Sequence, residues 1–110
     1  MRTLLVDLDP QCNATVALGI AKDRTPGVYE ALVGSAPAEL GIVKTQVNNL
    51  DLLPASPGLA GANIELPRED GYEQLFKQVL GPLRDRYDFV FIDCPPSLGP
   101  LTVGALAVVD

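Results

Sequence analysis

The chain has 110 residues, 47% hydrophobic and 20% charged, a composition that indicates one globular domain and excludes a disordered chain. Fourteen Asp and Glu against eight Lys and Arg give a net charge of −6, which makes the chain alone a poor binder of nucleic acid. Because it has no histidine, Ser-His and Cys-His nucleophile pairs and histidine-ligated metal sites are excluded.

The first part of the chain predicts a strand followed by two short helices. Residues 3–8 (TLLVDL) form a continuous apolar run that ends in an acid, which is typical of a parallel strand covered on both faces. After the turn DPQCN, the pattern predicts one or two helical turns over residues 14–20. Thr25-Pro26 then offers a cap and a first-turn proline for a helix through VYEALV, which Gly34 closes.

The second part predicts two further strands. These are residues 50–53 (LDLL) and residues 87–93 (YDFVFID), the latter again ending in an acid. Between them we expect a loop with a short helix over residues 56–67, then a helix that begins with a capping box of Asp70 and Glu73. A Gly-Pro pair kinks or splits that helix. Another helix starts in LTVGALAVV.

The alternation of strands and helices favours an α/β fold with a parallel sheet of about three strands and flanking helices. A strand begins already at residue 3, and the last apolar stretch runs to Asp110 without a closing element. We therefore expect residues 1–110 to be a single, incomplete domain.

The cysteines and the apolar runs bear on the cellular compartment. Cys12 and Cys94 are far apart and form no CxxC motif, so neither zinc nor dithiol chemistry is indicated. No apolar run reaches the ~18–20 residues of a membrane-spanning helix, and Asp7 and Asp9 interrupt the apolar start. We expect a cytoplasmic protein with reduced thiols and no membrane partner.

Acidic residues follow two of the predicted strands, Asp7 and Asp9 after the first and Asp93 at the end of the third. Ligands of open α/β sheets bind beyond the carboxyl ends of the strands. Carboxylates gathered there hold hydrated Mg²⁺ beside nucleotide phosphates. From the residues alone two readings stay open, a magnesium–nucleotide site or aspartates that only cap turns.

A strand followed by DxD also opens phosphatases of the haloacid-dehalogenase type, with the first Asp as nucleophile. That pattern has Thr or Val two residues after the second Asp, where this chain has Gln11. It also has a later pair of acids after a strand, whereas CPP follows Asp93. A phosphatase of this type is therefore less favoured than the other interpretations of the chain.

Three segments of the chain resemble the ParA/Soj family of partition ATPases, which belong to the deviant Walker-A class of P-loop proteins. They are LLVDLDPQCNAT (4–15), NLDLLPASPGLAGANIEL (49–66) and YDFVFIDCPPSLGPLTVGAL (87–106). The resemblance implies a P-loop NTPase-like three-layer fold, of which this chain carries part of the sheet.

The resemblance also implies roles for the acids. Asp9 looks like the catalytic acid that orients or activates the attacking water. Asp7 looks like its partner beside the Mg²⁺ and phosphate site, with a possible contact to the metal. Asp93 looks like the Walker-B acid that holds Mg²⁺ through water.

Two switch regions follow from the same resemblance. Asn13 and Thr15 fall in the region after DLDPQ, and Pro95, Pro96 and Ser97 fall in the loop after Walker B. The implied cofactors are Mg²⁺ and ATP. The implied partners are a ParB-like protein and a second copy of the ATPase, which ATP closes into a two-subunit sandwich. Non-specific DNA is bound in the family through a carboxyl-terminal part that these residues do not include.

The sequence departs from the family pattern at two points. Cys12 stands where the family usually has Gly, which tolerates backbone angles that cysteine resists. The family's P-loop, KGGxGKT/S, is not found, because no GKT or GKS occurs in the chain and the single Lys-Thr pair, at Lys44, follows Val43. Without that phosphate cradle we expect the chain alone to be inactive.

Two interpretations remain for such a chain. It is either an internal piece of a ParA-like ATPase or a non-catalytic module that pairs with a full-length relative. An in-frame P-loop in the coding DNA upstream of Met1 would favour the first. In the resembled fold the P-loop strand pairs with the Walker-B strand, so residues 89–93 should have one unpaired row of backbone groups.

Overall fold

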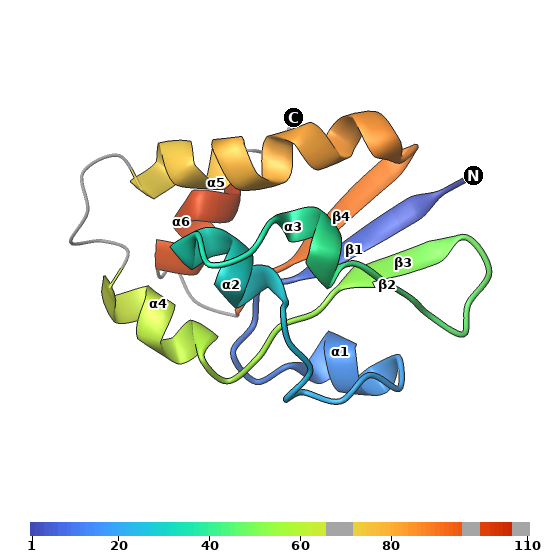
Figure 1. Cartoon of the computed structure of the whole chain (residues 1–110), viewed down its shortest axis with the longest axis horizontal. Helices are drawn as coiled ribbons and strands as arrows, with labels where there is room; N and C mark the ends of the chain where they lie inside the picture. Colours follow the sequence, from blue (N-terminus) through green and yellow to red (C-terminus); the bar gives the residue numbers. More distant parts are fainter. Residues whose placement is uncertain (66–71, 96–99, 107–110) are drawn as a thin grey trace.

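The computed structural model describes residues 1–65, 72–95 and 100–106. At its centre lies a four-stranded sheet with the order β2-β3-β1-β4 (Figure 1). Strands β1 (Thr3–Asp7), β3 (Leu50–Leu53) and β4 (Phe89–Asp93) run parallel, as predicted. The short strand β2 (Val43–Lys44) pairs antiparallel with β3 and was not predicted, because two residues carry no recognisable pattern. The sheet is therefore mixed.

Helices α2, α3, α5 and α6 lie on one side of the sheet in Figure 1, and α1 lies on the other. This arrangement of helices about the sheet confirms the expected α/β fold. The helical elements are α1 (Asn13–Ala17), α2 (Val28–Val33), α3 (Ala38–Gly41), α4 (Leu59–Glu65), α5 (Tyr72–Leu80), the 3₁₀ helix η2 (Gly81–Arg86) and α6 (Pro100–Leu106).

The hydrophobic core fills the space between the sheet and these helices. Leu4 and Val6 of β1 are fully buried there, with Val90 and Ile92 of β4 packed against the same cluster. Phe76 of α5 is the largest fully buried side chain. Burying one such side chain stabilises the fold by roughly 1.5–3 kcal/mol.

The amino-terminal cap of α2 differs from the prediction. The helix begins after Gly27, whose N–H donates to Glu30 Oε1 at 2.8 Å, so the Thr25-Pro26 cap is wrong. A Cβ at Gly27 would lie 2.5 Å from the carbonyl oxygen of Pro54, so this contact requires glycine. Gly34 closes the helix with φ 83°, as predicted.

The Gly-Pro pair splits the next predicted helix, as one of the two expected outcomes. Helix α5 ends at Leu80 and η2 starts at Gly81. Pro82 lacks the N–H that an α-helix would need to continue. The predicted start of this helix at Asp70 lies outside the described residues.

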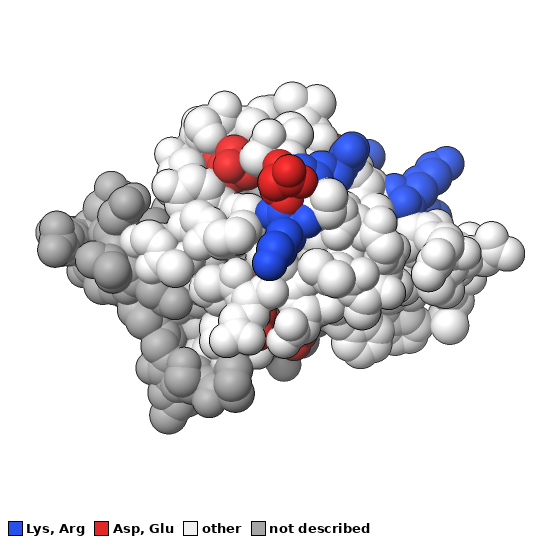
Figure 2. All heavy atoms as spheres, turned by 90° about the horizontal axis from the view of Figure 1, so that it is seen from below, with Lys and Arg blue, Asp and Glu red and all other residues white. Residues whose placement is uncertain are grey.

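Strand β4 forms one edge of the sheet and pairs, among the described strands, only with β1, as expected. Its side chains alternate, so Phe89 and Phe91 point away from the core and are 48% and 59% exposed. Their rings stack with centroids 6.3 Å apart. Figure 2, seen from the side of α1, shows that most of this face is formed by residues other than lysine, arginine, aspartate and glutamate. An unpaired, apolar edge is a template for association.

We expect the isolated chain to form oligomers or aggregates through this edge. Phe91→Lys should shift it toward monomer, because a charge at an edge strand opposes pairing with another edge. Light scattering after size exclusion measures the change. Leu40→Lys on α3, where the side chain is 67% exposed, is the matched control and should not alter association. A native chain that is monomeric with a sharp cooperative melt would contradict the expectation.

Three polar residues, Arg2, Asp51 and Tyr87, contact one another near the amino ends of β1, β3 and β4. The Tyr87 hydroxyl donates to Asp51 Oδ2 at 2.8 Å, and the Arg2 guanidinium lies 3.7 Å from the same oxygen and 5.0 Å from the Tyr87 ring centroid. Burial, the hydrogen bond to Asp51 and the charge of Asp51 raise the pKa of Tyr87 from 10.0 to about 12. The neutral phenol therefore stabilises the fold below pH 10.0, and this contribution is lost as the pH rises toward about 12.

The variant Tyr87→Phe should be less stable at pH 8 by about 0.5–1.5 kcal/mol, the net worth of one hydrogen bond. Denaturant unfolding at pH 8 and at pH 11 measures the free energy of unfolding of both proteins. The gap between them should narrow at pH 11, because the unfolded wild-type chain then ionises Tyr87 while the folded one, with a pKa of about 12, still holds the proton, and the variant has no hydroxyl at this position. Parallel losses of stability in the two proteins would contradict the assignment.

Candidate functional site

The acids singled out in the sequence converge at the carboxyl edge of the sheet. Asp7 and Asp93 are register partners at the ends of β1 and β4. The backbones of β1 and β4 stay hydrogen-bonded one residue beyond Asp7, because Leu8 N donates to the Asp93 carbonyl at 2.8 Å. Asp9 follows two residues after Asp7, so three carboxylates gather where parallel strands place their ligands.

Asp7 is fully buried, and both of its carboxylate oxygens accept hydrogen bonds. Oδ1 accepts from the Asp9 backbone N–H at 3.1 Å. Oδ2 accepts from the backbone N–H of Thr15 at 2.9 Å and from its hydroxyl at 2.7 Å. Hydrogen bonds to the charged form are what allow a carboxylate to be buried.

Asp9 lies in the turn after β1 and is half-buried. Its Oδ1 accepts from Gln11 N at 3.0 Å, and its carbonyl accepts from Cys12 N at 2.9 Å. Within the described residues Oδ2 has no hydrogen-bond partner. Oδ1 therefore helps to fix the turn after β1.

Cys12 precedes α1 in a left-handed backbone conformation, with φ 61° and ψ 30°. Such angles cost a non-glycine residue about 1–3 kcal/mol, which explains why glycine suits this position. The side chain is buried, and Sγ donates to the Pro10 carbonyl at 3.3 Å. Burial and the charge of Asp7 raise the pKa of the Cys12 thiol, which keeps it protonated as a donor.

Asp93 is half-buried at the end of β4. Burial raises the pKa of Asp93, and the negative charges of Asp7 and Asp9 raise it further. A cation at this edge would relieve that repulsion. Within residues 1–65, 72–95 and 100–106, no group of three His, Cys, Asp or Glu is placed to hold a metal directly. The carboxylates at this edge are oxygen donors, the ligand type that Mg²⁺ prefers.

The predicted switch residues differ in their surroundings. Asn13 is exposed at the start of α1, whereas Thr15 is buried in its middle. Pro95 follows β4, and its carbonyl accepts from the Thr102 hydroxyl of α6 at 3.5 Å. Pro96 and Ser97 lie outside the described residues.

The sequence analysis missed the contribution of the segment after β3. The Ala55 N–H donates to Thr15 Oγ1 at 3.0 Å, across 40 positions of sequence. Ser56 beside it is also buried. The signal was available, because residues 54–57 follow the carboxyl end of a predicted parallel strand, where ligand sites gather.

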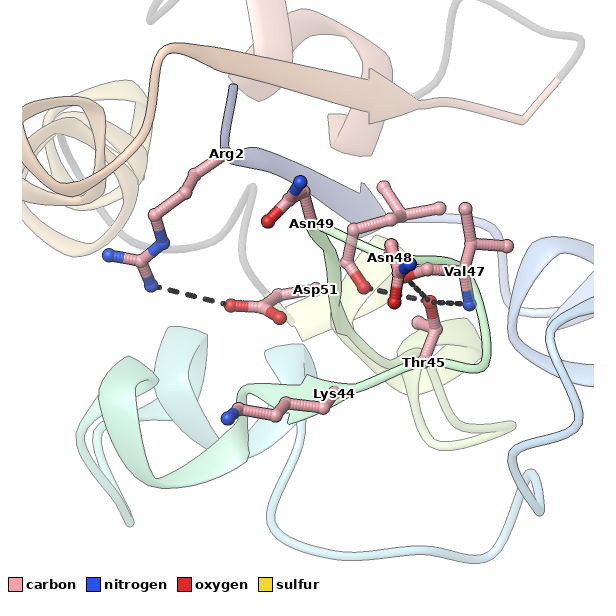
Figure 3. A pocket seen from close by; sticks show the side chains of 8 residues that line it. Arg2, Lys44, Thr45, Val47, Asn48, Asn49 and Asp51 are labelled. Atoms are coloured by element: carbon pink, nitrogen blue, oxygen red, sulfur yellow. Dashed lines mark hydrogen bonds and ion pairs between the residues drawn. The ribbon is translucent and has the colours of Figure 1, made fainter.

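A pocket of about 360 Å³ lies at the other end of the sheet, near the amino ends of β1 and β3 (Figure 3). Several of its polar groups already bond one another. Thr45 Oγ1 donates to the Leu50 carbonyl at 2.7 Å, and Arg2 reaches Asp51. None of the three converging acids lines this pocket. Its lining residues are Arg2, Lys44, Thr45, Val47, Asn48, Asn49, Leu50 and Asp51.

None of the described helices has the length and apolar character needed to cross a membrane.

A family model and several known protein sequences match this chain along its length. The family model described as "AAA domain" matches residues 1–110. The chain is 47% identical over 110 residues to the chromosome partitioning protein ParA of Myxococcus xanthus, a match that covers 99% of this chain and 39% of that protein. It is 49% identical over 110 residues to the sporulation initiation inhibitor protein Soj of Bacillus subtilis, covering 99% and 44%.

Solved structures with the same fold include cobyrinic acid a,c-diamide synthase from Mycobacterium smegmatis, with a TM-score of 0.88 at 44% identity over 96% of this chain and 43% of that one. That protein has also been solved with an ATP analog and magnesium bound. A plasmid partition protein from Borrelia burgdorferi matches with a TM-score of 0.87 at 29% identity, over 99% of this chain and 50% of that one.

The chain thus spans about two fifths of the length of the curated relatives it matches. A family model covers all of its residues. The parallel pairing of β1 with β4, which places Asp7 opposite Asp93, is consistent with that match. The chain belongs to the AAA-domain family and is similar over 99% of its length to ParA and Soj proteins.

Proposed function

We propose that this chain supplies the acidic half of the Mg²⁺–ATP site of a ParA/Soj-type ATPase that acts in chromosome or plasmid partitioning. The observation that carries the proposal is the register of Asp7 with Asp93, with Asp9 two residues further on. The names of its relatives support the partitioning role. The neighbour solved with an ATP analog and magnesium supports the choice of ligand.

In this proposal Asp93 would hold Mg²⁺ through water, at the carboxyl end of β4 where it is the register partner of Asp7. When bound, the metal neutralises charge on the phosphate oxygens. Asp9 acts on the attacking water. Its Oδ1 is fixed by Gln11 N at 3.0 Å, which leaves Oδ2 to accept a hydrogen bond from that water.

The phosphate cradle must come from outside these residues, because the chain has no GKT or GKS. We therefore propose that the 110-residue chain alone does not turn over ATP. In the whole protein ATP would close a two-subunit sandwich, and a ParB-like protein and non-specific DNA would be its further partners.

Strand β4 has one edge that no other described strand pairs with, which favours a second candidate, a non-catalytic module that pairs with a full-length relative. Both candidates place the chain against another segment at this edge. In the first candidate Asp9 takes part in ATP hydrolysis, and in the second it does not. The ATPase activity of an Asp9 variant therefore distinguishes the two candidates.

Joining the chain to the flanking segments of a close relative provides the test. Asp93→Ala should weaken ATP binding and turnover together, because metal positioning is lost. Asp9→Ala should still bind ATP but lose ~10²–10⁴-fold in turnover, or about 3–5 kcal/mol of barrier. It should accumulate as an ATP-bound dimer. ATP affinity, turnover and melting temperature are measured on the same preparation.

Asp85→Ala, a change in an exposed acid of η2, is the matched control and should leave all three quantities unchanged. Near-normal turnover in an Asp9→Ala protein that is merely less stable would sink the catalytic assignment. Mg²⁺-dependent turnover by the unextended chain, abolished by Asp9→Ala, would overturn its proposed inactivity.

A further inference from the structure

The Asp7 carboxylate has little capacity left for a metal. A carboxylate offers about four lone-pair positions, and three protein donors occupy both oxygens of Asp7. Its side chain has no exposed surface. Mg²⁺ usually keeps several of its waters, so a ligand that acts through water must itself be reachable by water.

The direction of the hydrogen bonds around Thr15 follows from which of its neighbours can donate and which can accept. The Ala55 N–H can only donate, so Thr15 Oγ1 accepts from it at 3.0 Å. The one hydroxyl hydrogen of Thr15 is then left for Asp7 Oδ2, 2.7 Å away. The chain of bonds runs from Ala55 through Thr15 to Asp7 and joins the end of β3 to the end of β1.

Asp7 also replaces a missing helix cap. Cys12, the residue before α1, makes no side-chain cap bond. Thr15 is the third residue of α1, and its N–H is one of the donors that a capping side chain would normally satisfy. Asp7 accepts it instead, at 2.9 Å, from the neighbouring strand.

The same carboxylate holds the backbone of Asp9, through the bond from Asp9 N to Oδ1 at 3.1 Å. Two segments, the Asp9 turn and α1, therefore meet on one buried carboxylate, and Thr15 connects it to the segment after β3. We infer that Asp7 is a positioning residue that fixes Asp9 and the first switch region, and not a ligand of the metal. The inference rests on the proposed function for what Asp9 does, but its structural part can be tested without nucleotide.

The first test is amide hydrogen exchange, followed by NMR on the Phe91→Lys background to limit association. Asp7→Asn should speed exchange of the Asp9, Thr15 and Ala55 amides together, by roughly tenfold or more, the equivalent of one lost hydrogen bond. Ala55 is diagnostic, because Asp7 does not touch it and acts on it through Thr15. Thr15→Val should speed exchange at Ala55 similarly, and Thr15→Ser, which keeps the hydroxyl, should restore the native rate.

Asp85→Asn, a change in an exposed acid of η2, is the matched control and should leave the three amides unchanged. Unchanged exchange at Asp9 and Ala55 in Asp7→Asn would overturn the inference. If Asp7→Asn fails to fold, the pair Thr15→Val and Thr15→Ser still decides, since equal exchange at Ala55 in both would overturn it as well.

The second test uses the ATPase joined to a relative's flanking segments. Asp7→Asn and Thr15→Val should lower turnover to a similar extent while the Mg²⁺ concentration for half-maximal activity stays the same. A rise in that concentration for Asp7→Asn alone would show a metal ligand and refute the inference. If the native joined protein has no ATPase activity, the proposed function fails, whereas the exchange experiment still judges the role of Asp7.

Discussion

The buried carboxylate of Asp7 is the constraint on which the carboxyl edge of this fold depends. Taking an anion out of water costs several kcal/mol unless its lone pairs are satisfied. Here the compensating donors come from the Asp9 turn and from both the backbone and the hydroxyl of Thr15. The chain can bury Asp7 only when these segments adopt one arrangement, so the hydrogen bonds specify geometry as well as stability.

The three acids at this edge divide into different physical roles. Asp7 has its charge compensated by protein donors, whereas Asp93 has its pKa raised by burial and by its acidic neighbours. Asp9 lies between these cases, with one oxygen fixed in the turn. An acid that the fold compensates is suited to hold structure, and an acid left under repulsion is suited to meet a cation.

The sequence predicted the parts of the fold that local patterns encode. Continuous apolar runs identified β1, β3 and β4, and the Gly-Pro pair identified the break after α5. It also predicted that Asp7, Asp9 and Asp93 share one edge, because parallel strands place their carboxyl ends together.

What the sequence could not provide depends on contacts between distant segments. The cap of α2 is Gly27 because the Pro54 carbonyl approaches it closely, a contact invisible to a capping pattern. Likewise, Thr15 was assigned to a switch region by resemblance alone, and nothing local indicated its bond to Ala55. The left-handed backbone at Cys12 is also set by the turn around it, since cysteine itself disfavours those angles.

The most direct measurement is a crystal structure of the joined protein with an ATP analogue and Mg²⁺. The account predicts that Asp7 keeps its hydrogen bonds to Asp9 N and to Thr15, that Asp93 contacts the waters of the metal, and that Asp9 faces the terminal phosphate. An Asp7 oxygen in the metal's own coordination sphere, at about 2.0–2.1 Å, with the Thr15 hydroxyl released, would contradict it.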